Sequence, residues 1–475
     1  MGSFSFFFPL RRRLRALLVL SGLVAAVASA ASVPTSQARP RQPERLNVVV
    51  ILSDDERTDG TSVMKNVQSL LADHGVTFTD YHVTSSLCGP SRASILSGQY
   101  SHHTGVYDNF GPHSVSSFNA SSTLATWLHS SGYQTALVGK YINAYTTAEH
   151  HVIPPGWDDW QALDSIPMEA YYNYTLNENG KLVHFGHAPS DYSTKVLTNK
   201  AVDFIHTARK PFFLYYAPVA PHLPAIPAKQ DQGKLENIAP IHSPAFNQRN
   251  IGKEPWRFWH KDMLKAAAQL YINHVRIRQL ESLLAIDRGV KRIVAELKAR
   301  HELDHTVIVY TSDNGFLWGE HRLGGKIWPY QESTNVPLIV RAPWTTSATT
   351  NRQPVLNVDL APTISALAGI TPGLPEDGSS FLPMLHGISM PTWRKSFLVE
   401  FLGKSKLPNG PPPYIAVQSK QFLYVDYFNG WRELYDLKRD PWELDNVAES
   451  PAYQPTDRAL QVLVHELYAA PATRP

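Results

Sequence analysis

The strongest constraint on the fold of this chain is a set of short apolar runs that lack the polar alternation of a half-exposed strand. The first run is LNVVVIL at 46–52, and similar runs lie at 133–139, 210–219, 305–315 and 336–343. Such runs are typical of strands that are buried on both faces of a sheet. The alternation of these runs with helical stretches predicts an α/β fold with a mainly parallel sheet flanked by helices. The helical stretches lie at 62–75, 191–208, 264–303 and 358–370.

The C-terminal part of the sequence has a different pattern. The segments KSFLVEFLG, PPYIAVQS, KQFLYVDYFN and WRELYDLKRDP are strand candidates that follow one another without intervening helices. Residues 455–470 then have helical spacing. We therefore predict a small antiparallel α+β subdomain at 395–475, which follows a larger domain at 45–394. Residues 221–262 are rich in Pro, His and Gln and predict a long irregular insertion near the functional site.

The N-terminus has the features of an export signal. A basic cluster, RRRLR at 11–15, precedes the apolar run ALLVLSGLVAAVASA. This run is short, and small residues at 28–30 offer a cleavage site, so we interpret residues 1–30 as a secretory signal. An uncleaved membrane anchor and a twin-arginine signal are the alternatives. With a linker at 31–44, the sequence predicts a secreted protein, or one in a periplasmic or lysosome-like compartment, without a stable membrane anchor.

The charge balance does not indicate a nucleic-acid partner. The formal net charge is +3, but four arginines lie in the leader, which contains no acidic residue. The rest of the chain has 40 basic and 41 acidic residues. A chain with this balance has no basic footprint for nucleic acid.

Acidic and amide side chains follow two of the predicted strands. Asp54 and Asp55 come after the first run, and Asp313 and Asn314 come after a later one. In parallel sheets the functional site lies at the carboxyl ends of the strands. Oxygen donors of this kind suit a hard cation such as Ca²⁺, with Mg²⁺ as the alternative. By itself, the Asp54–Asp55 pair is as often a helix cap or a solvated turn.

Cys88 is the only cysteine in the 475 residues, so the chain has no internal disulfide. A lone cysteine is most often a small buried apolar residue. Its context, SSLCGPSRASILSGQY at 85–100, is more specific. A helix from Pro90 would place Arg92, four residues after Cys88, on the same face as the thiol.

This context resembles the signature of the sulfatase family, C-x-P-x-R followed by ASILSGQY. In that family a separate formylglycine-generating enzyme oxidises the cysteine to formylglycine, an aldehyde. Further blocks match in family order from residue 46 to about 448: NVVVILSDDERTDG, GKYINAY, APVAPHLPA, YTSDNGFLWGEHRLGGK and ELYDLKRDPWELDNVA. Within the family, the chain is most similar to the N-acetylglucosamine-6-sulfatase group. The resemblance implies an alkaline-phosphatase-like fold and hydrolysis of sulfate monoesters of a sulfated carbohydrate or an aryl alcohol.

The resemblance also implies roles for individual residues. Cys88, as a hydrated aldehyde, would bind the metal beside the four oxygen ligands and attack sulfur with one hydroxyl, and the other hydroxyl would expel sulfate. Arg92 would orient this group, while Lys140 and Lys326 would contact the sulfate. His222 would protonate the leaving alcohol. Taken singly, such residues are more often surface cations or structural loop histidines.

One position departs from the family pattern. Many sulfatases have a histidine two residues after the lysine that matches Lys140, and this chain has Ile142 there. Isoleucine cannot transfer a proton, so the base for sulfate release is unassigned. His321 is a candidate, and a structural loop role for it is at least equally consistent with the sequence.

Three functions fit these observations. A metal-dependent sulfatase is the first, a phosphoester or phosphonate monoester hydrolase with the same site is the second, and a non-catalytic binding protein on the same fold is the third. The sequence leaves open the physiological substrate, endo or exo action and the oligomeric state. It also leaves open the glycosylation of the sequons at Asn119 and Asn173.

Overall fold

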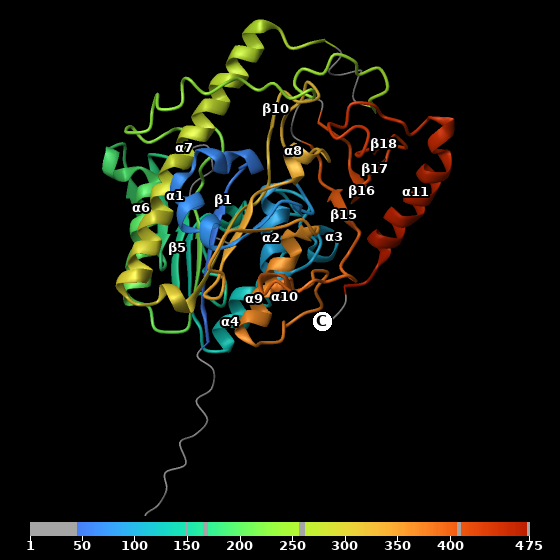
Figure 1. Cartoon of the computed structure of the whole chain (residues 1–475). Coiled ribbons are helices and arrows are strands. Elements are labelled where there is room, and N and C mark those ends of the chain that lie inside the picture. Colours follow the sequence, from blue (N-terminus) through green and yellow to red (C-terminus); the bar gives the residue numbers. More distant parts are fainter. Residues whose placement is uncertain (1–44, 149–150, 165–169, 256–261, 406–409, 473–475) are drawn as a thin grey trace, which may run out of the picture. The chain divides into compact units, whose positions relative to one another are not determined.

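The computed structural model describes residues 45–148, 151–164, 170–255, 262–405 and 410–472 (Figure 1). The predicted signal and linker at 1–44 lie outside the described residues. Among the described residues, no helix combines the length and apolar composition that crossing a membrane requires.

A ten-stranded sheet forms the centre of the fold. Its middle strands, β9, β1, β8, β4 and β5, run parallel, and β12, β6 and β7 join antiparallel at the two sides. The predicted mainly parallel α/β fold is therefore confirmed. In sheet order the strands are β13 (Thr349–Asn351), β2 (Val76–Phe78), β12 (Leu338–Arg341), β9 (Thr306–Ser312), β1 (Asn47–Ser53), β8 (Phe212–Ala217), β4 (Gln134–Gly139), β5 (Asp159–Leu163), β6 (Tyr174–Glu178) and β7 (Lys181–Phe185).

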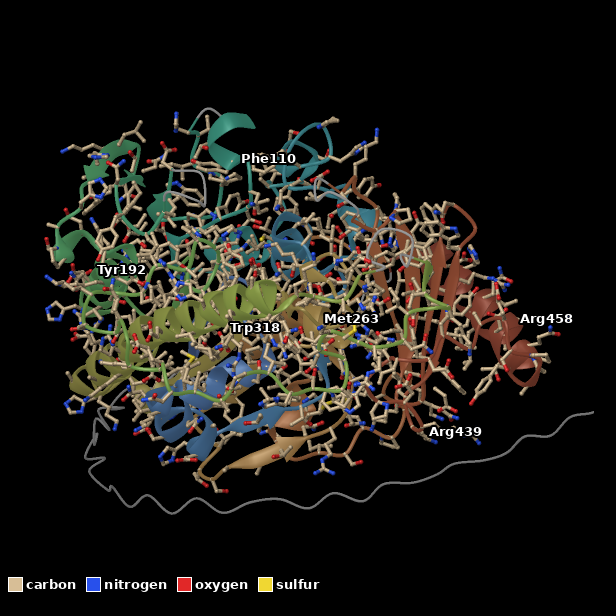
Figure 2. All side chains as sticks on the ribbon, turned by 90° about the horizontal axis from the view of Figure 1, so that it is seen from above. Phe110, Tyr192, Met263, Trp318, Arg439 and Arg458 are labelled. Atoms are coloured by element: carbon tan, nitrogen blue, oxygen red, sulfur yellow. The ribbon has the colours of Figure 1, made fainter. Side chains whose placement is uncertain are left out.

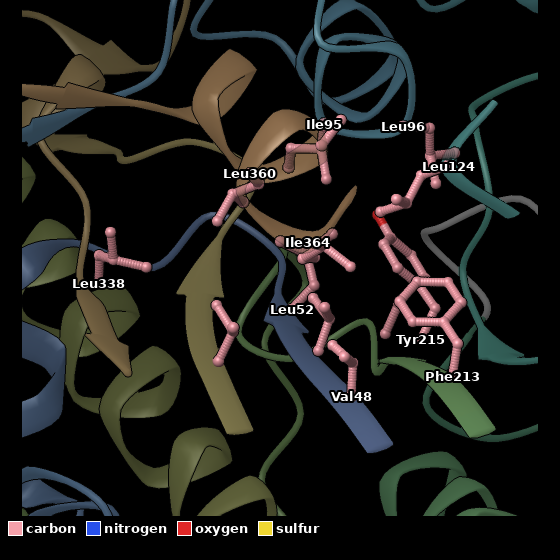
Figure 3. Close-up of a cluster of buried hydrophobic side chains, with 14 of the residues drawn as sticks. Val48, Leu52, Ile95, Leu96, Leu124, Phe213, Tyr215, Leu338, Leu360 and Ile364 are labelled. Atoms are coloured by element: carbon pink, nitrogen blue, oxygen red, sulfur yellow. The ribbon is translucent and has the colours of Figure 1, made fainter. Parts of the chain in front are cut away.

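Two layers of helices cover the sheet, one on each face (Figure 1). Along β1, Val48, Val50 and Leu52 point into one apolar core, and Val49 and Ile51 point into the other. Successive side chains of a strand point to opposite faces, so a continuous apolar run buries both faces. Figure 3 shows the first core, in which side chains of α2, α4 and α9 meet those of the strands. The layers contain α2 (Cys88–Ser97), α4 (Leu124–Ser130) and α9 (Leu360–Ala368) on one face, and α1 (Lys65–Leu70), α6 (Ser193–Thr207) and α7 (Ala266–Ala299) on the other.

Several elements differ from the prediction in extent or direction. The predicted helix at 62–75 is only α1, flanked by short 3-10 turns. The predicted strand at 336–343 runs antiparallel to β9. The segment between them contains the short strands β10 (Leu317–Trp318) and β11 (Gly324–Gly325) and the four-residue helix α8 (Gln331–Thr334), and not the long crossover helix that usually joins parallel strands. Residues 221–254 contain no helix or strand, in agreement with the predicted insertion.

The C-terminal part forms the predicted small antiparallel sheet. The strands lie in chain order, and the helix α11 packs against them (Figure 1). Tyr330 connects this sheet to the rest of the protein, because its hydroxyl donates to Glu433 over 2.8 Å. The elements are β15 (Ser396–Phe401), β16 (Tyr414–Ser419), β17 (Phe422–Tyr427), β18 (Arg432–Asp436) and α11 (Gln454–Ala469).

The helix α2 ends over a buried acidic side chain. Gly98 has φ of 72° and ends the helix, and a Cβ at this position would lie 2.5 Å from an oxygen of Glu376. Neither carboxylate oxygen of Glu376 has a hydrogen-bond partner among the described residues. Burial, together with the nearby Asp359 and Asp377, raises the pKa of Glu376 to about 8.

This pKa predicts a pH-dependent stability. The unfolded glutamate titrates near pH 4.3, so the folded protein binds the proton more tightly and loses stability as the pH rises from about 4.5 to about 8. We expect Glu376→Gln to match the wild type near pH 4 and to exceed its unfolding free energy by about 1–3 kcal/mol near pH 8.5. Urea unfolding at both pH values measures the difference. The exposed Glu449→Gln serves as control, and parallel pH profiles for all three proteins would disprove the assignment.

Candidate active site

The carboxyl ends of β1 and β9 bring the predicted oxygen ligands together. The two strands are adjacent and parallel, with Ser53 opposite Ser312, so the residues that follow them meet at one edge of the sheet. The backbone N–H of Asp55 donates to Asp313 Oδ1 over 3.1 Å, and Asn314 Nδ2 donates to Asp55 Oδ1 over 2.6 Å. Asp55 has a φ of 70°, which turns the chain back toward β9. Asp54, Asp55, Asp313 and Asn314 are all buried.

The N-terminus of α2 presents Cys88 to this cluster. The helix begins at Cys88 rather than at Pro90, and Asn109 Oδ1 accepts the backbone N–H of Gly89 over 2.7 Å. Cys88 Sγ lies 3.5 Å from Asp54 Oδ1 and 4.0 Å from Asp55 Oδ1. The predicted i, i+4 relation to Arg92 holds within the helix.

Arg92 is completely buried and joins three segments of the site. Its Nε donates to Asp313 Oδ2 over 2.7 Å, and its Nη1 donates to the carbonyl oxygen of Lys140 over 2.9 Å. Its Nη2 lies 3.6 Å from Asp54 Oδ2. A planar guanidinium with several donors suits such a junction better than an ammonium group.

The two predicted lysines donate hydrogen bonds to carboxylates of the cluster. Lys140 Nζ donates to Asp54 Oδ2 over 2.6 Å, and Lys326 Nζ donates to Asp55 Oδ1 over 2.5 Å and to Cys88 Sγ over 2.6 Å. Of these two lysines, Lys326 is therefore the one that contacts the sulfur.

His222 is at the open side of the cluster. Its Nδ1 lies 2.6 Å from the carbonyl oxygen of Leu223, so this nitrogen is the N–H donor. Its Nε2 lies 3.7 Å from Asp55 Oδ2. With 17% of its side chain exposed, His222 can reach both the cluster and a ligand that enters from solvent.

The electrostatics of the cluster keep the acids ionised and the thiol neutral. Burial alone would raise the pKa of Asp54 and Asp55, but the opposing charges, mainly Lys140 for Asp54 and Lys326 for Asp55, hold both pKa values below their usual range. Burial raises the pKa of the Cys88 thiol to about 12, even though Lys140 and Lys326 oppose the shift. An unmodified Cys88 is therefore a neutral thiol and a weak nucleophile at neutral pH.

The donor set fits a hard divalent cation. Asn314 Oδ1 is buried and has no hydrogen-bond partner among the described residues, and it lies beside carboxylates that carry full negative charge. Oxygen atoms of this kind are the ligands that Ca²⁺ and Mg²⁺ take. The three carboxylates are balanced by Arg92, Lys140 and Lys326, so a bound divalent cation would leave the site positive and suited to an anionic substrate.

Ile142 and His321, the two residues that bear on the unassigned base, are both buried in packed surroundings. Ile142 is 3% exposed and packs in the apolar core. His321 is also buried, its ring stacks on Tyr330 with 4.2 Å between centroids, and its Nδ1 contacts Gln248 Oε1 over 3.0 Å. Burial lowers the pKa of His321 to about 3, which keeps it neutral. These contacts are typical of a histidine with a structural role.

A pocket of about 380 Å³ opens over the cluster. We call it the catalytic pocket. Asp55, His222 and Lys326 form part of its wall, and residues without a motif form the rest. Sequence reasoning missed these residues, since polar and aromatic loop residues have no spacing that marks them. They include Asp108, Asn109 and Phe110 (Phe110 is labelled in Figure 2), and Phe401 and Lys404 from the C-terminal part.

Comparisons with known proteins agree with this geometry. The family described as Sulfatase matches residues 46–370, and the one described as N-sulphoglucosamine sulphohydrolase, C-terminal, matches residues 319–470. The N-acetylglucosamine-6-sulfatase of Homo sapiens is 37% identical over 482 residues, which cover 91% of this chain and 85% of the human protein.

Solved structures share the fold. One of them, a protein in complex with its substrate D-glucosamine-2-N,6-O-disulfate, has a TM-score of 0.78 and 26% identity, over 89% of this chain and 97% of that chain. The phosphonate monoester hydrolase of Agrobacterium radiobacter has a TM-score of 0.73 and 21% identity, over 90% of this chain and 96% of that chain. These matches confirm the predicted alkaline-phosphatase-like architecture, and the extent of the family match shows that the chain belongs to the sulfatase family and is a sulfuric ester hydrolase.

Proposed function

We propose that this sulfatase removes the 6-O-sulfate of a terminal N-acetylglucosamine-6-sulfate, through a formylglycine formed from Cys88. The observation that carries this proposal is the position of the buried Cys88, which contacts Lys326 and lies beside Asp54 and Asp55, because Asp55 and Lys326 form part of the wall of a sugar-sized pocket. Secretion, which exposes the chain to a formylglycine-generating enzyme on its route, is part of the proposal.

Each residue of the cluster has a distinct task in this proposal. Lys140 and Lys326 bind two oxygens of the sulfate, and their charge offsets the negative charge that develops there. Arg92 fixes the distance between α2 and the ends of β1 and β9 through its contacts to Asp54 and Asp313. Positioning of this kind lowers the barrier, since small displacements of a reacting group cost large factors in rate.

Two groups complete the chemistry. Asp54, Asp55, Asp313 and Asn314 would hold Ca²⁺ or Mg²⁺, which polarises sulfate oxygens and makes a coordinated hydroxyl more acidic. Residue 88, as a hydrated aldehyde, supplies one hydroxyl for attack on sulfur and a second that expels sulfate when the aldehyde forms again.

His222 is proposed to protonate the leaving alcohol from Nε2, because its Nδ1–H is already donated to Leu223. We expect His222→Ala to lower kcat/KM for N-acetylglucosamine-6-sulfate by about 10²–10⁴-fold. The loss for 4-nitrophenyl sulfate should be less than about tenfold, because nitrophenolate leaves without a proton. Equal losses for the two esters would show that His222 binds sulfate instead of donating a proton.

The substrate assignment is tested by sulfate release from a matched panel. Terminal N-acetylglucosamine-6-sulfate should be hydrolysed, aryl sulfates should be hydrolysed more weakly, and phosphate and phosphonate esters should not react. An enzyme that rejects every sulfated sugar and hydrolyses phosphonate esters would instead be a phosphonate monoester hydrolase with this site.

A further inference from the structure

A second pocket, of about 470 Å³, lies between α6, α7 and the loop residues 228–230. We call it the α6–α7 pocket. It shares no residue with the catalytic pocket, and its volume is in the range of pockets that hold one small ligand. Tyr192, which lines it, is labelled in Figure 2 beside the helices α6 and α7.

The lining of the α6–α7 pocket is cationic. Lys195, Lys229, Arg288 and Arg292 line it, and none of the lining residues is acidic. Neither Lys195 nor Lys229 makes a side-chain hydrogen bond or an ion pair with any residue in the described ranges. Their ammonium groups are therefore available to an anionic ligand.

The two arginines are held in place from outside the pocket. Arg288 pairs with Asp231 through two contacts of 2.7 and 2.5 Å, and Lys234 lies 3.1 Å from the same carboxylate. Arg292 Nη1 donates to Asn199 Oδ1 over 2.6 Å. One buried carboxylate thus faces Arg288 and Lys234, and a net positive charge remains at the pocket.

Two tyrosines line the α6–α7 pocket, the half-buried Tyr172 and the buried Tyr192. The ring centroids of Tyr172 and Tyr192 lie 5.4 Å apart at an interplanar angle of 60°. The hydroxyl of Tyr192 donates to the carbonyl oxygen of Ile226 over 3.0 Å, which fixes this ring. Aromatic rings pack against the apolar face of a sugar ring, and cations at the rim pair with its sulfate or carboxylate groups.

The polypeptide connects the two pockets over a short distance. Leu223 lines the catalytic pocket and Ala228 lines the α6–α7 pocket. Five residues of fully extended chain span at most about 18 Å, so this is the upper limit for the distance between the two Cα atoms. In addition, Tyr171 donates to the carbonyl oxygen of His222 over 2.7 Å, and the next residue, Tyr172, lines the α6–α7 pocket.

We propose that the α6–α7 pocket is a second binding site for a sulfated saccharide. It holds an inner sugar of the same saccharide whose terminal sugar occupies the catalytic pocket. The identity of this saccharide rests on the proposed function. The binding energy from this pocket would appear in KM for oligosaccharides, because the contact is the same in the ground state and the transition state.

The test uses the full-length, formylglycine-containing enzyme and the double variant Lys195→Ala/Lys229→Ala. The control is Lys291→Ala/Lys298→Ala, which removes the same charge from exposed positions of α7 outside the pocket. Three probes are compared: a sulfated tetrasaccharide that ends in N-acetylglucosamine-6-sulfate, the monosaccharide N-acetylglucosamine-6-sulfate and 4-nitrophenyl sulfate. Calorimetry measures binding, and sulfate release measures turnover.

We expect the pocket variant to weaken tetrasaccharide binding about tenfold and to raise KM in proportion, with unchanged kcat. For the two small probes, the affinity, KM and kcat of the pocket variant should equal those of the wild type. The control variant should bind all three probes with wild-type affinity. Equal tetrasaccharide affinity in the pocket and control variants would overturn the proposal. A loss shared by tetrasaccharide and monosaccharide would also overturn it, since it would indicate a disturbed catalytic pocket. If no sugar is desulfated, the proposed function fails. The calorimetric comparison of tetrasaccharide binding then still shows whether the α6–α7 pocket binds saccharide.

Discussion

Asp54→Asn is expected to lower kcat/KM for every sulfate ester on the order of 10³-fold and to reduce the affinity for Ca²⁺. The substitution keeps the shape of the side chain but removes the charge that faces Lys140 and Arg92. It therefore replaces a charged oxygen ligand of the proposed cation by a neutral amide oxygen, and it leaves two buried cations with one anionic partner fewer. Steady-state kinetics with calcium titration measure both effects.

Asp359→Asn is the matched control, because Asp359 is equally buried and is also paired with an arginine, Arg394, outside the cluster. The control should lose stability but keep its activity per folded molecule. The account would be wrong if Asp54→Asn retained wild-type turnover after exhaustive chelation.

Arg92→Lys is expected to combine two large losses. A lysine can make one of the contacts to Asp313, Asp54 and the carbonyl oxygen of Lys140, but it cannot make all three. Breaking a buried ion pair costs about 3–5 kcal/mol of folding stability. We expect an unfolding free energy lower by that amount, together with a loss in kcat on the order of 10²-fold or more from misplacement of residue 88.

Arg394→Lys separates the two effects, because Arg394 forms a similar pair with Asp359 away from the site. It should be less stable than the wild type, with unchanged kcat at a temperature where it is folded. If Arg92→Lys also retained the wild-type kcat when folded, Arg92 would have only a structural role.

The sequence was sufficient to predict the centre of the site. The runs at 46–52 and 305–315 bury both faces of their strands, so their position in the middle of the sheet and the meeting of Asp54 with Asp313 could be inferred. The four-residue spacing of Cys88 and Arg92 fixed their common helix face. The C-terminal sheet was also predictable, since four strand-like segments without helices can only pair with one another or with an existing edge.

Other features depend on contacts between distant segments and could not be predicted. The catalytic pocket combines residues near 109 with residues near 401 that no motif connects. The α6–α7 pocket arises because two helices and the loop at 228–230 pack without filling the space between them. The environment of His321 depends on Tyr330 and Gln248, whose positions are set by tertiary packing.

The most direct test of the central claim is a comparison between the chemical state of residue 88 and turnover in the same preparations. Co-expression with graded amounts of a formylglycine-generating enzyme should give samples in which a growing fraction of the Cys88 peptide is about 18 Da lighter than the thiol form, whereas competing oxidations add mass. We predict that sulfate release from N-acetylglucosamine-6-sulfate is proportional to this fraction and extrapolates to zero without it. Full turnover in a sample whose residue 88 peptides all carry a free thiol would contradict the account.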